Sequence, residues 1–283
     1  MTAHIAFLGT GRLGAGFVEA ALGRGDSVTV WNRSADKARA LEQFGAKAAA
    51  TPADAVRGAA RVHLVLSDDA AVESVIGELR AGLSPDAIIV DHTTTQPALT
   101  AERARRLNAA GVRYIHCPVF IGPAAARQGK GTIMAAGPRA LFDAVEPALA
   151  RQAEKVVYLG DRPEMAAVLK LAGNALIIGN CGLIADVLSM AGNAGVSPAD
   201  TLQLFDFFNP LGGAMLRGKA MAARDFSPSF ELTMARKDVR LMLETAGDLP
   251  LATLPSLAAR MDALIAQGHG AEDMAVIATD AVR

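Results

Sequence analysis

The chain has 283 residues, enough for one large domain or for two ordinary ones with a hydrophobic core each. Its residues are 51% hydrophobic and 20% charged, as in globular proteins, and 28 basic against 29 acidic side chains give no reason to expect nucleic acid or an anionic membrane as partner. The two cysteines and five histidines are scattered rather than spaced as metal ligands, so no metal site is expected.

The N-terminus leads directly into a strand-like run at residues 4–8, without the pattern of an export signal, so we expect a cytoplasmic protein. Short β-rich runs then alternate with helical ones. The expected strands are 5–8, 27–31, 62–66, 87–91, 112–116, 132–136 and 155–159, and the expected helices are 13–24, 35–44, 70–80, 97–110 and 138–150. This order predicts a doubly wound, mostly parallel α/β sheet with helices on both faces.

After about residue 163 the strand signal ends, and residues 164–193 have the pattern of one long helix. This helix is apolar nearly all the way round, so it should be buried on every side. Its most apolar stretch, 171–185, is interrupted by Asn174 and Asn180 and looks too short and too polar to span a bilayer.

Further helices are expected at 230–246 and 255–266. The chain therefore divides into an α/β domain, residues 1–162, and an all-α C-terminal domain, residues 163–283, joined by the long helix.

A glycine-rich motif follows the first expected strand. It reads Gly9-Thr10-Gly11-Arg12-Leu13-Gly14, the pattern G-x-G-x-x-G, and it lies between a strand and an amphipathic helix. Gly9 permits a tight turn, Gly11 lets a pyrophosphate approach the backbone, and Gly14 lets the helix pack on the sheet. The alternative is a strand–helix turn without a ligand, but the context favours a dinucleotide-binding Rossmann domain.

The end of the second expected strand indicates which dinucleotide is bound. NAD-preferring folds usually carry Asp or Glu there, whereas this chain has Asn32-Arg33-Ser34, with Lys37 one helical turn later. Arg33 can pair with a 2′-phosphate, and Asn32 and Ser34 can hydrogen-bond to it. Unless Arg33 is merely solvated, the motif predicts NADP(H) as the cofactor.

The long helix carries two polar residues on one face. Lys170 and Asn174 are four residues apart in an otherwise apolar segment, where such groups are costly without partners. A desolvated lysine shifts its pKa readily, which suits proton transfer to a substrate oxygen. Alternatively, the ammonium simply reaches solvent at the start of the helix.

Six landmarks together resemble the β-hydroxyacid dehydrogenase family, which includes 3-hydroxyisobutyrate dehydrogenases and glyoxylate or succinic semialdehyde reductases. They are the glycine motif, Trp31 through Ser34, Asp91 through Pro97, Pro118-Val119, Lys170 through Asn174, and Lys237-Asp238. Their order and spacing cover nearly the whole chain. The resemblance implies a C-terminal domain like that of 6-phosphogluconate dehydrogenase, although the chain is too short to be that enzyme.

The resemblance also implies roles for individual residues. Lys170 matches the catalytic lysine that gives a proton to the carbonyl oxygen or takes it back, and Asn174 matches the amide that orients both groups. Thr94 matches a threonine beside the nicotinamide, and Lys237 matches a lysine that closes over the cofactor. The long helix of the family commonly builds a homodimer, which we expect here.

The chain departs from the family at its substrate residues. Members that bind small hydroxy acids usually carry Ser-Gly-Gly after Pro-Val, where this chain has Phe120-Ile121-Gly122, and Thr93 lies in a segment that also differs. Phe120, Gly122 and Thr93 are therefore candidate substrate residues. The ring at position 120 predicts a substrate bulkier or less anionic than a C4 hydroxy acid.

The leading hypothesis is an NADPH-dependent reductase of a small aldehyde, ketone or keto acid, or the reverse oxidation of a hydroxy acid. Imine reductases share this plan and the Asn-Arg-Ser strand end but generally lack a lysine at the position of Lys170. A non-catalytic NADP-binding module is the third hypothesis, and the presence of Lys170 counts against it too.

Overall fold

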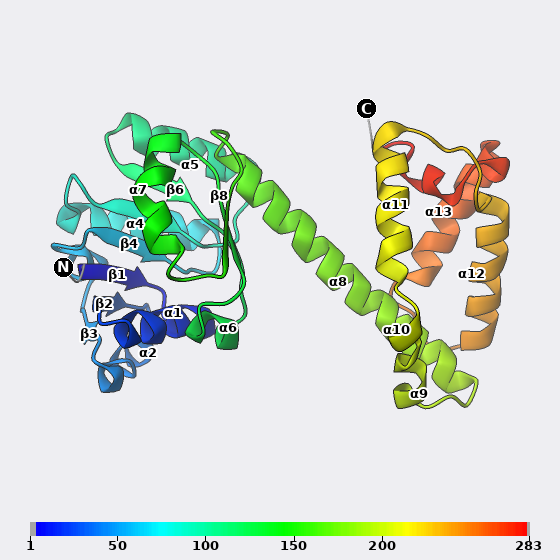
Figure 1. Ribbon diagram of the computed structural model, residues 1–283, viewed down its shortest axis with the longest axis horizontal. Helices are drawn as coiled ribbons and strands as arrows, with labels where there is room; N and C mark the ends of the chain where they lie inside the picture. The colour runs from blue at the N-terminus through cyan, green and yellow to red at the C-terminus, as the bar shows by residue number, and fades with distance from the viewer. Residues whose placement is uncertain (1–3, 282–283) are drawn as a thin grey trace. The chain divides into compact units, whose positions relative to one another are not determined.

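The computed structural model describes residues 4–281, which fall into two compact units, Met1–Asn174 and Ala175–Arg283. The division lies inside one helix, α8 (Glu164–Asn193), which contributes to both units (Figure 1). The domain boundary expected at 162/163 stays a prediction.

The first unit is built on a six-stranded sheet whose strand order is β3-β2-β1-β4-β5-β6. All of its pairings are parallel, and the order is that of the Rossmann fold, as the sequence predicted. The strands are β1 (His4–Leu8), β2 (Ser27–Trp31), β3 (Lys47–Ala48), β4 (Arg61–Leu64), β5 (Ile88–Asp91) and β6 (Arg113–His116).

A smaller sheet, in the order β7-β8-β9, completes the unit. It contains β7 (Val119–Phe120), β8 (Thr132–Ala135) and β9 (Lys155–Tyr158); β7 is antiparallel to β8, and β9 is parallel to it. The helices of the unit before α8 are α1 (Arg12–Gly23), α2 (Ala35–Arg39), α3 (Pro52–Val56), α4 (Asp69–Leu79), α5 (Pro97–Ala109), α6 (Pro123–Arg127) and α7 (Arg139–Leu149).

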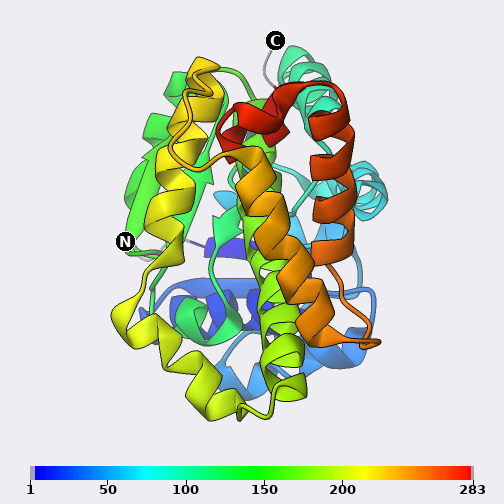
Figure 2. The same cartoon turned by 90° about the vertical axis from the view of Figure 1, so that its right-hand side faces the viewer.

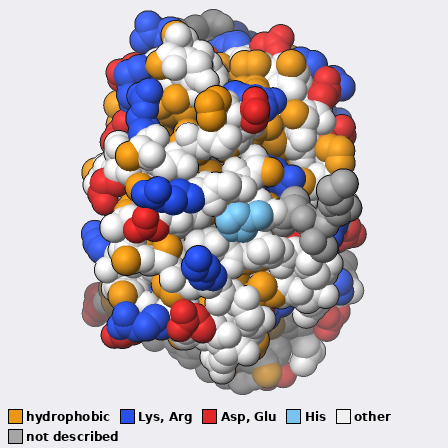
Figure 3. Space-filling model, turned by 90° about the vertical axis from the view of Figure 1, so that its left-hand side faces the viewer, with side chains coloured by type: hydrophobic (Ala, Val, Ile, Leu, Met, Phe, Trp, Pro, Cys, Tyr) orange, Lys and Arg blue, Asp and Glu red, His pale blue; other side chains and the backbone are white. Residues whose placement is uncertain are grey.

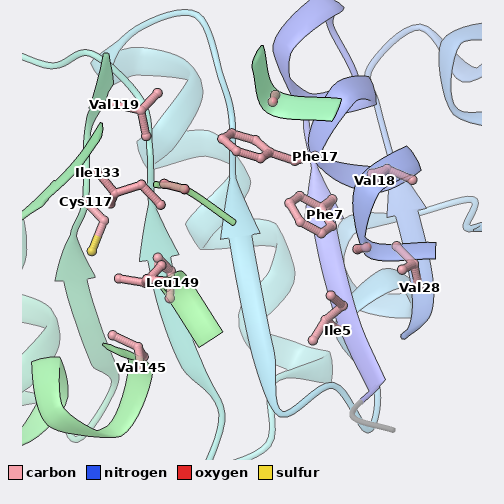
Figure 4. Close-up of a cluster of buried hydrophobic side chains, with 14 of the residues drawn as sticks. Ile5, Phe7, Phe17, Val18, Val28, Cys117, Val119, Ile133, Val145 and Leu149 are labelled. Atoms are coloured by element: carbon pink, nitrogen blue, oxygen red, sulfur yellow. The ribbon is translucent and has the colours of Figure 1, made fainter. Parts of the chain in front are cut away.

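Alternating strand residues divide the core of this unit between the two faces of the sheet. Ile5 and Phe7 pack on one face with Phe17 of α1 and with Val145 and Leu149 of α7 (Figure 4). Ala6 and Leu8 of the same strand pack on the other face, with apolar side chains of α3, α4 and α5. This two-sided burial explains why the strands are apolar almost throughout.

Local sequence sets several helix starts. Thr51, Asp68 and Gln96 each accept a backbone N–H of the first turn of the helix that follows, namely α3, α4 and α5. The single helix expected over 35–44 is wrong: α2 ends at Arg39, and a short 3-10 helix covers Glu42–Phe44.

On one face of the first unit, acidic and basic side chains are interspersed among apolar ones (Figure 3). The pattern matches the near-zero net charge of the chain.

The second unit is helical. Besides the rest of α8 it contains α9 (Pro198–Leu202), α10 (Leu204–Phe207), α11 (Pro210–Ala223), α12 (Leu232–Ala246) and α13 (Leu254–Ala266), followed by two 3-10 helices, His269–Ala271 and Met274–Ala278. Helices α12 and α13 lie side by side (Figure 2), and Leu232, Met261 and Leu264 belong to the buried core of the unit.

Two buried aspartates fix the loops of this unit. Asp186 of α8, which is 1% exposed, accepts the backbone N–H groups of Ala252, Thr253 and Leu254, and Asp273 accepts those of Ser229 and Phe230. Burial alone would raise the pKa of Asp186, but the three N–H groups outweigh it and the pKa is lowered.

The long helix has the expected bounds but not the expected burial. Ala166, Ala167 and Asp186 are its buried residues, whereas Leu176, Ile177 and Ile178 are 56–70% exposed. By length and hydropathy alone α8 could cross a membrane, since its most apolar window has a mean hydropathy of 1.7 and is 6% buried. The exclusion based on residues 171–185 was therefore too strict.

Candidate active site

The first unit has a cavity of about 820 Å³ at the carboxyl ends of β1, β2 and β4, where Rossmann folds bind nucleotides. Most of the predicted cofactor residues line it. They are Gly9, Gly11, Arg12, Leu13, Gly14, Asn32, Arg33 and Ser34, joined by Trp31, Lys37 and the segment from Val65 to Asp68.

The three glycines of the motif have different surroundings. Gly9 has φ +98°, and a Cβ there would lie 2.1 Å from the carbonyl oxygen of Val65. A Cβ at Gly14 would lie 2.0 Å from the carbonyl oxygen of Gly9, whereas Gly11 faces open space. Gly9 and Gly14 therefore allow the tight turn and close packing, and Gly11 leaves the backbone accessible from the cavity.

These surroundings fit the pyrophosphate of a dinucleotide. Helix α1 begins after Gly11 without a side-chain cap, so its first N–H groups remain available to an anion. The Thr10 hydroxyl in the same loop is buried and has no hydrogen-bond partner among the described residues. Both features would be satisfied by a bound phosphate group or by an ordered water.

Asn32 has a structural role that the sequence analysis missed. Its Oδ1 accepts the backbone N–H of Thr10 at 3.0 Å, and its Nδ2 donates to the carbonyl of Ser34 at 3.1 Å. The side chain thus ties the end of β2 to the glycine loop, so its main task is to shape the phosphate-binding turn.

The charge of the cavity is mixed. Arg12, Arg33 and Lys37 are exposed at its wall, but Asp68 and Glu78 also line it. Asp68 caps α4, and hydrogen bonds from Ala71 and Ser67, together with the charge of Arg33, lower its pKa. No carboxylate was expected here from the end of β2, because Asp68 and Glu78 belong to a later part of the chain, at the start of α4 and within it.

The threonines of the segment after β5 differ in exposure. Thr94 is exposed, whereas Thr93 is 2% exposed and its hydroxyl accepts the backbone N–H of Leu66 at 3.1 Å. The burial of Thr93 argues against its predicted contact with substrate, because the hydroxyl instead joins the ends of β4 and β5.

Buried histidines lie beneath this segment. His92 donates from Nδ1 to the carbonyl of Cys117 at 2.7 Å, so its Nε2 accepts from Nδ1 of His63 at 3.0 Å. Burial lowers the pKa of His92 to about 4 and holds that of His63 well below its ordinary value, so both rings stay neutral at pH 7. They are core residues of the sheet rather than catalytic groups.

Lys170 and Asn174, which their spacing placed on one helical face, are joined by a hydrogen bond. Lys170 Nζ donates to Asn174 Oδ1 at 3.0 Å, and burial lowers the pKa of the ammonium. Nζ also lies 4.2 Å from the centroid of the Phe120 ring. In the first unit, therefore, an amide and an aromatic face surround this cation, with no carboxylate among its described partners.

Two further predicted residues lie on other elements. Gly122 precedes α6 as its N-cap, with open space around it. Lys237 lies on α12 of the second unit, where its Nζ is 2.8 Å from the carboxylate of Asp238. Its closure over a cofactor stays a prediction.

Two family models match the chain. The NAD binding domain of 6-phosphogluconate dehydrogenase matches residues 4–160, and the domain described as NAD-binding of NADP-dependent 3-hydroxyisobutyrate dehydrogenase matches residues 165–279. The first unit is accordingly a nicotinamide-dinucleotide-binding domain.

Individual proteins agree with these models. Glyoxylate/succinic semialdehyde reductase 1 of Arabidopsis thaliana is 28% identical, with 92% of this chain and 91% of that protein covered. The cytokine-like nuclear factor N-PAC of Anopheles gambiae is also 28% identical over 86% of this chain, which spans only 44% of that longer protein. The imine reductase of Streptomyces aurantiacus shares the fold, with a TM-score of 0.89 at 22% identity over 99% of this chain and 100% of that one. The chain belongs to the β-hydroxyacid dehydrogenase family.

Proposed function

We propose that the protein is an NADPH-dependent oxidoreductase that interconverts a small aldehyde or ketone and the corresponding alcohol or hydroxy acid, with Lys170 as general acid and base. The observation that carries this proposal is the lysine itself. Its ammonium is partly desolvated, hydrogen-bonded to Asn174, and not neutralised by a carboxylate in the first unit. Such a lysine can give up its proton more readily than an ordinary one.

Each residue has a defined task in this reaction. A bound nicotinamide supplies or accepts the hydride. In reduction, Lys170 Nζ gives a proton to the carbonyl oxygen, and in oxidation the neutral amine takes the proton from the alcohol. Because Asn174 Oδ1 accepts from Nζ, its Nδ2 group remains free to donate to the same substrate oxygen.

The end of β2 supports NADPH rather than NADH. Arg33 and Lys37 line the cavity as exposed cations, and the Ser34 hydroxyl makes no capping bond to α2. A 2′-phosphate placed there would gain charge-assisted hydrogen bonds. The match to a domain of NADP-dependent 3-hydroxyisobutyrate dehydrogenase supports the same preference.

We also propose that the protein forms a homodimer through α8. Leu176 and Ile178 are 69% and 70% exposed on that helix, and side chains of this kind are normally covered in a soluble protein.

Reduction of an imine is the second candidate function. The apolar ring of Phe120 beside Lys170 favours it, because an imine substrate carries no carboxylate that must be held. The presence of Lys170 favours carbonyl reduction instead, because a general acid is needed less when the nitrogen of an imine substrate is already protonated.

The test is to incubate the protein and NADPH with a panel of aldehydes, ketones, keto acids and one cyclic imine. We expect turnover of a carbonyl compound, and we expect Lys170→Ala to reduce kcat by about 10²-fold or more while the affinity for NADPH stays unchanged. Lys155→Ala, an exposed lysine on β9, is the control. NADPH binding without turnover of any compound would instead favour a non-catalytic binding module, and turnover of the imine alone would favour the second candidate.

A further inference from the structure

The ammonium of Lys170 rests on an aromatic ring from a distant part of the chain. Phe120 lies on the two-residue strand β7, and its ring centroid is 4.2 Å from Nζ, well within the range of a cation–π contact. The ring is half-buried and packs against Met134, Ala136 and Ala166. Its own position is therefore held by the second sheet and by the first turn of α8.

Gly173 leaves the space that the ring occupies. A Cβ at this position would lie 2.2 Å from Cζ of Phe120 and 2.8 Å from Cε1, closer than any real contact. Because Gly173 follows Lys170 by three residues, the helix presents both to the same ring. A glycine that costs the helix stability thus permits the aromatic contact with the lysine.

The groups around Lys170 in the first unit carry no charge. Among the described residues they are the Phe120 ring from β7 and the Asn174 amide from α8 itself. The side chains that pack on the ring are apolar: Met134 of β8, Ala136 just after it, and Ala166 of α8. Burial is accordingly the cause of the lowered pKa of Lys170. A substrate carboxylate would find an aromatic wall here in place of a hydrogen-bond donor.

We propose that Phe120 is the positioning and specificity residue of this site: its ring holds the Lys170 side chain in place and selects carbonyl compounds with an apolar substituent over those with a carboxylate. The proposal has two halves. The substrate half, the selection among carbonyl compounds, rests on the proposed function. The lysine half, the positioning of Lys170, concerns only contacts within the first unit and can be tested without turnover.

The lysine half is tested by NMR titration of the ¹³C-dimethylated protein, with the Lys170 signal assigned from Lys170→Arg. Phe120→Tyr keeps the ring, so the pKa of Lys170 should stay as in the wild type. Phe120→Leu keeps the apolar bulk but loses the cation–π contact, so the pKa should fall by roughly half a unit to one unit. Phe120→Ser admits water to the ammonium, so the pKa of Lys170 should rise. Equal pKa values in the wild type and the Leu and Ser variants would overturn the positioning role.

The substrate half is tested with two aldehydes of nearly equal shape, 4-methylpentanal and succinic semialdehyde, which differ in an isopropyl group against a carboxylate. In the wild type we expect kcat/KM for 4-methylpentanal to exceed that for succinic semialdehyde by about 10-fold or more. Phe120→Ser should lower this ratio by at least the same factor of about 10. A wild-type preference for succinic semialdehyde, or a ratio that Phe120→Ser leaves unchanged, would refute the selectivity.

The two failures can be told apart. If the wild-type protein binds NADPH but oxidises it with neither aldehyde nor any other carbonyl compound, the proposed function fails, and the titration still decides whether Phe120 positions Lys170. If the wild type turns over but the Phe120 series changes neither the pKa nor the ratio, this inference fails and the proposed function stands.

Discussion

Replacing Gly173 by alanine should lack the stabilising effect that the same change has at Gly77, elsewhere in the first unit. Alanine is more favourable than glycine in a helix interior by about 1 kcal/mol. At Gly77 of α4, where a Cβ would meet nothing within 4 Å, Gly77→Ala should raise the free energy of unfolding by about that amount. At Gly173 the new methyl would overlap the Phe120 ring at 2.2 Å.

The overlap determines the magnitude of the difference. Relieving it requires the ring to move by about 1 Å or more, since carbon atoms pack at about 3.5–4 Å. Overpacking of this kind costs about 1–3 kcal/mol, which offsets the gain in helix propensity. The two Gly→Ala variants should therefore differ by about 1–3 kcal/mol, and Gly173→Ala should also alter the pKa of Lys170, because the displaced ring leaves the ammonium.

The assay is urea unfolding followed by fluorescence of Trp31, the single tryptophan, which reports on the first unit. In a Phe120→Ala background the overlap is gone, so Gly173→Ala should then stabilise about as much as Gly77→Ala does. If Gly173→Ala stabilises equally with and without the ring, the contact between Phe120 and Gly173 does not exist in solution and the reasoning is refuted.

Three further outcomes are expected. Removing the cation in Arg33→Ala should weaken binding of NADPH by roughly 10- to 150-fold and change that of NADH little, as measured by fluorescence titration; equal losses would argue against a 2′-phosphate site. Asp186→Asn should lower the free energy of unfolding of the helical unit by about 2–3 kcal/mol at neutral pH, measured by circular dichroism. Because the folded pKa of Asp186 lies below its ordinary value of 3.8, its stabilisation is present above about pH 4 and is lost as the pH falls through the folded pKa, so wild type and variant should converge in acid. Ile178→Asp should give a monomer by light scattering with unchanged helix content, and a dimer that survives the change would exclude this face as the interface.

The first unit was largely predictable because its strands are buried on both faces. All seven expected strands are present within a residue or two, since a run of apolar β-formers flanked by turn residues has few other structures available. The strands that were missed, β3 and β7, have two residues each and carry no periodic signal. Helix α11 was missed because its three glycines and exposed apolar residues conceal any helical face.

In the candidate site, too, local patterns were predictable and contacts between distant residues were not. The glycine turn and the pair Lys170 and Asn174 are local patterns, so their spacing and the neighbouring elements pointed to them. The contact between Phe120 and Gly173 joins residues more than 50 positions apart, and nothing in either segment indicates it. The hydrogen bond from Thr10 to Asn32 could not be expected from the sequence either, because it depends on how two neighbouring strands end.

The exposure of α8 has two physical explanations, a bilayer or another protein surface, and the fixed points of the helix distinguish them. Lys170 and Gly173 pack against the Phe120 ring of the first unit, and Asp186 is buried under three backbone N–H groups of the second. The stretch free to enter lipid is residues 175–185, about 17 Å long at 1.5 Å per residue, whereas a hydrocarbon core is about 30 Å thick. A helix held at both ends cannot extend this stretch without losing those contacts. Another protein surface does not require that length, so the exposed leucine and isoleucine residues favour a second copy of the chain over a membrane.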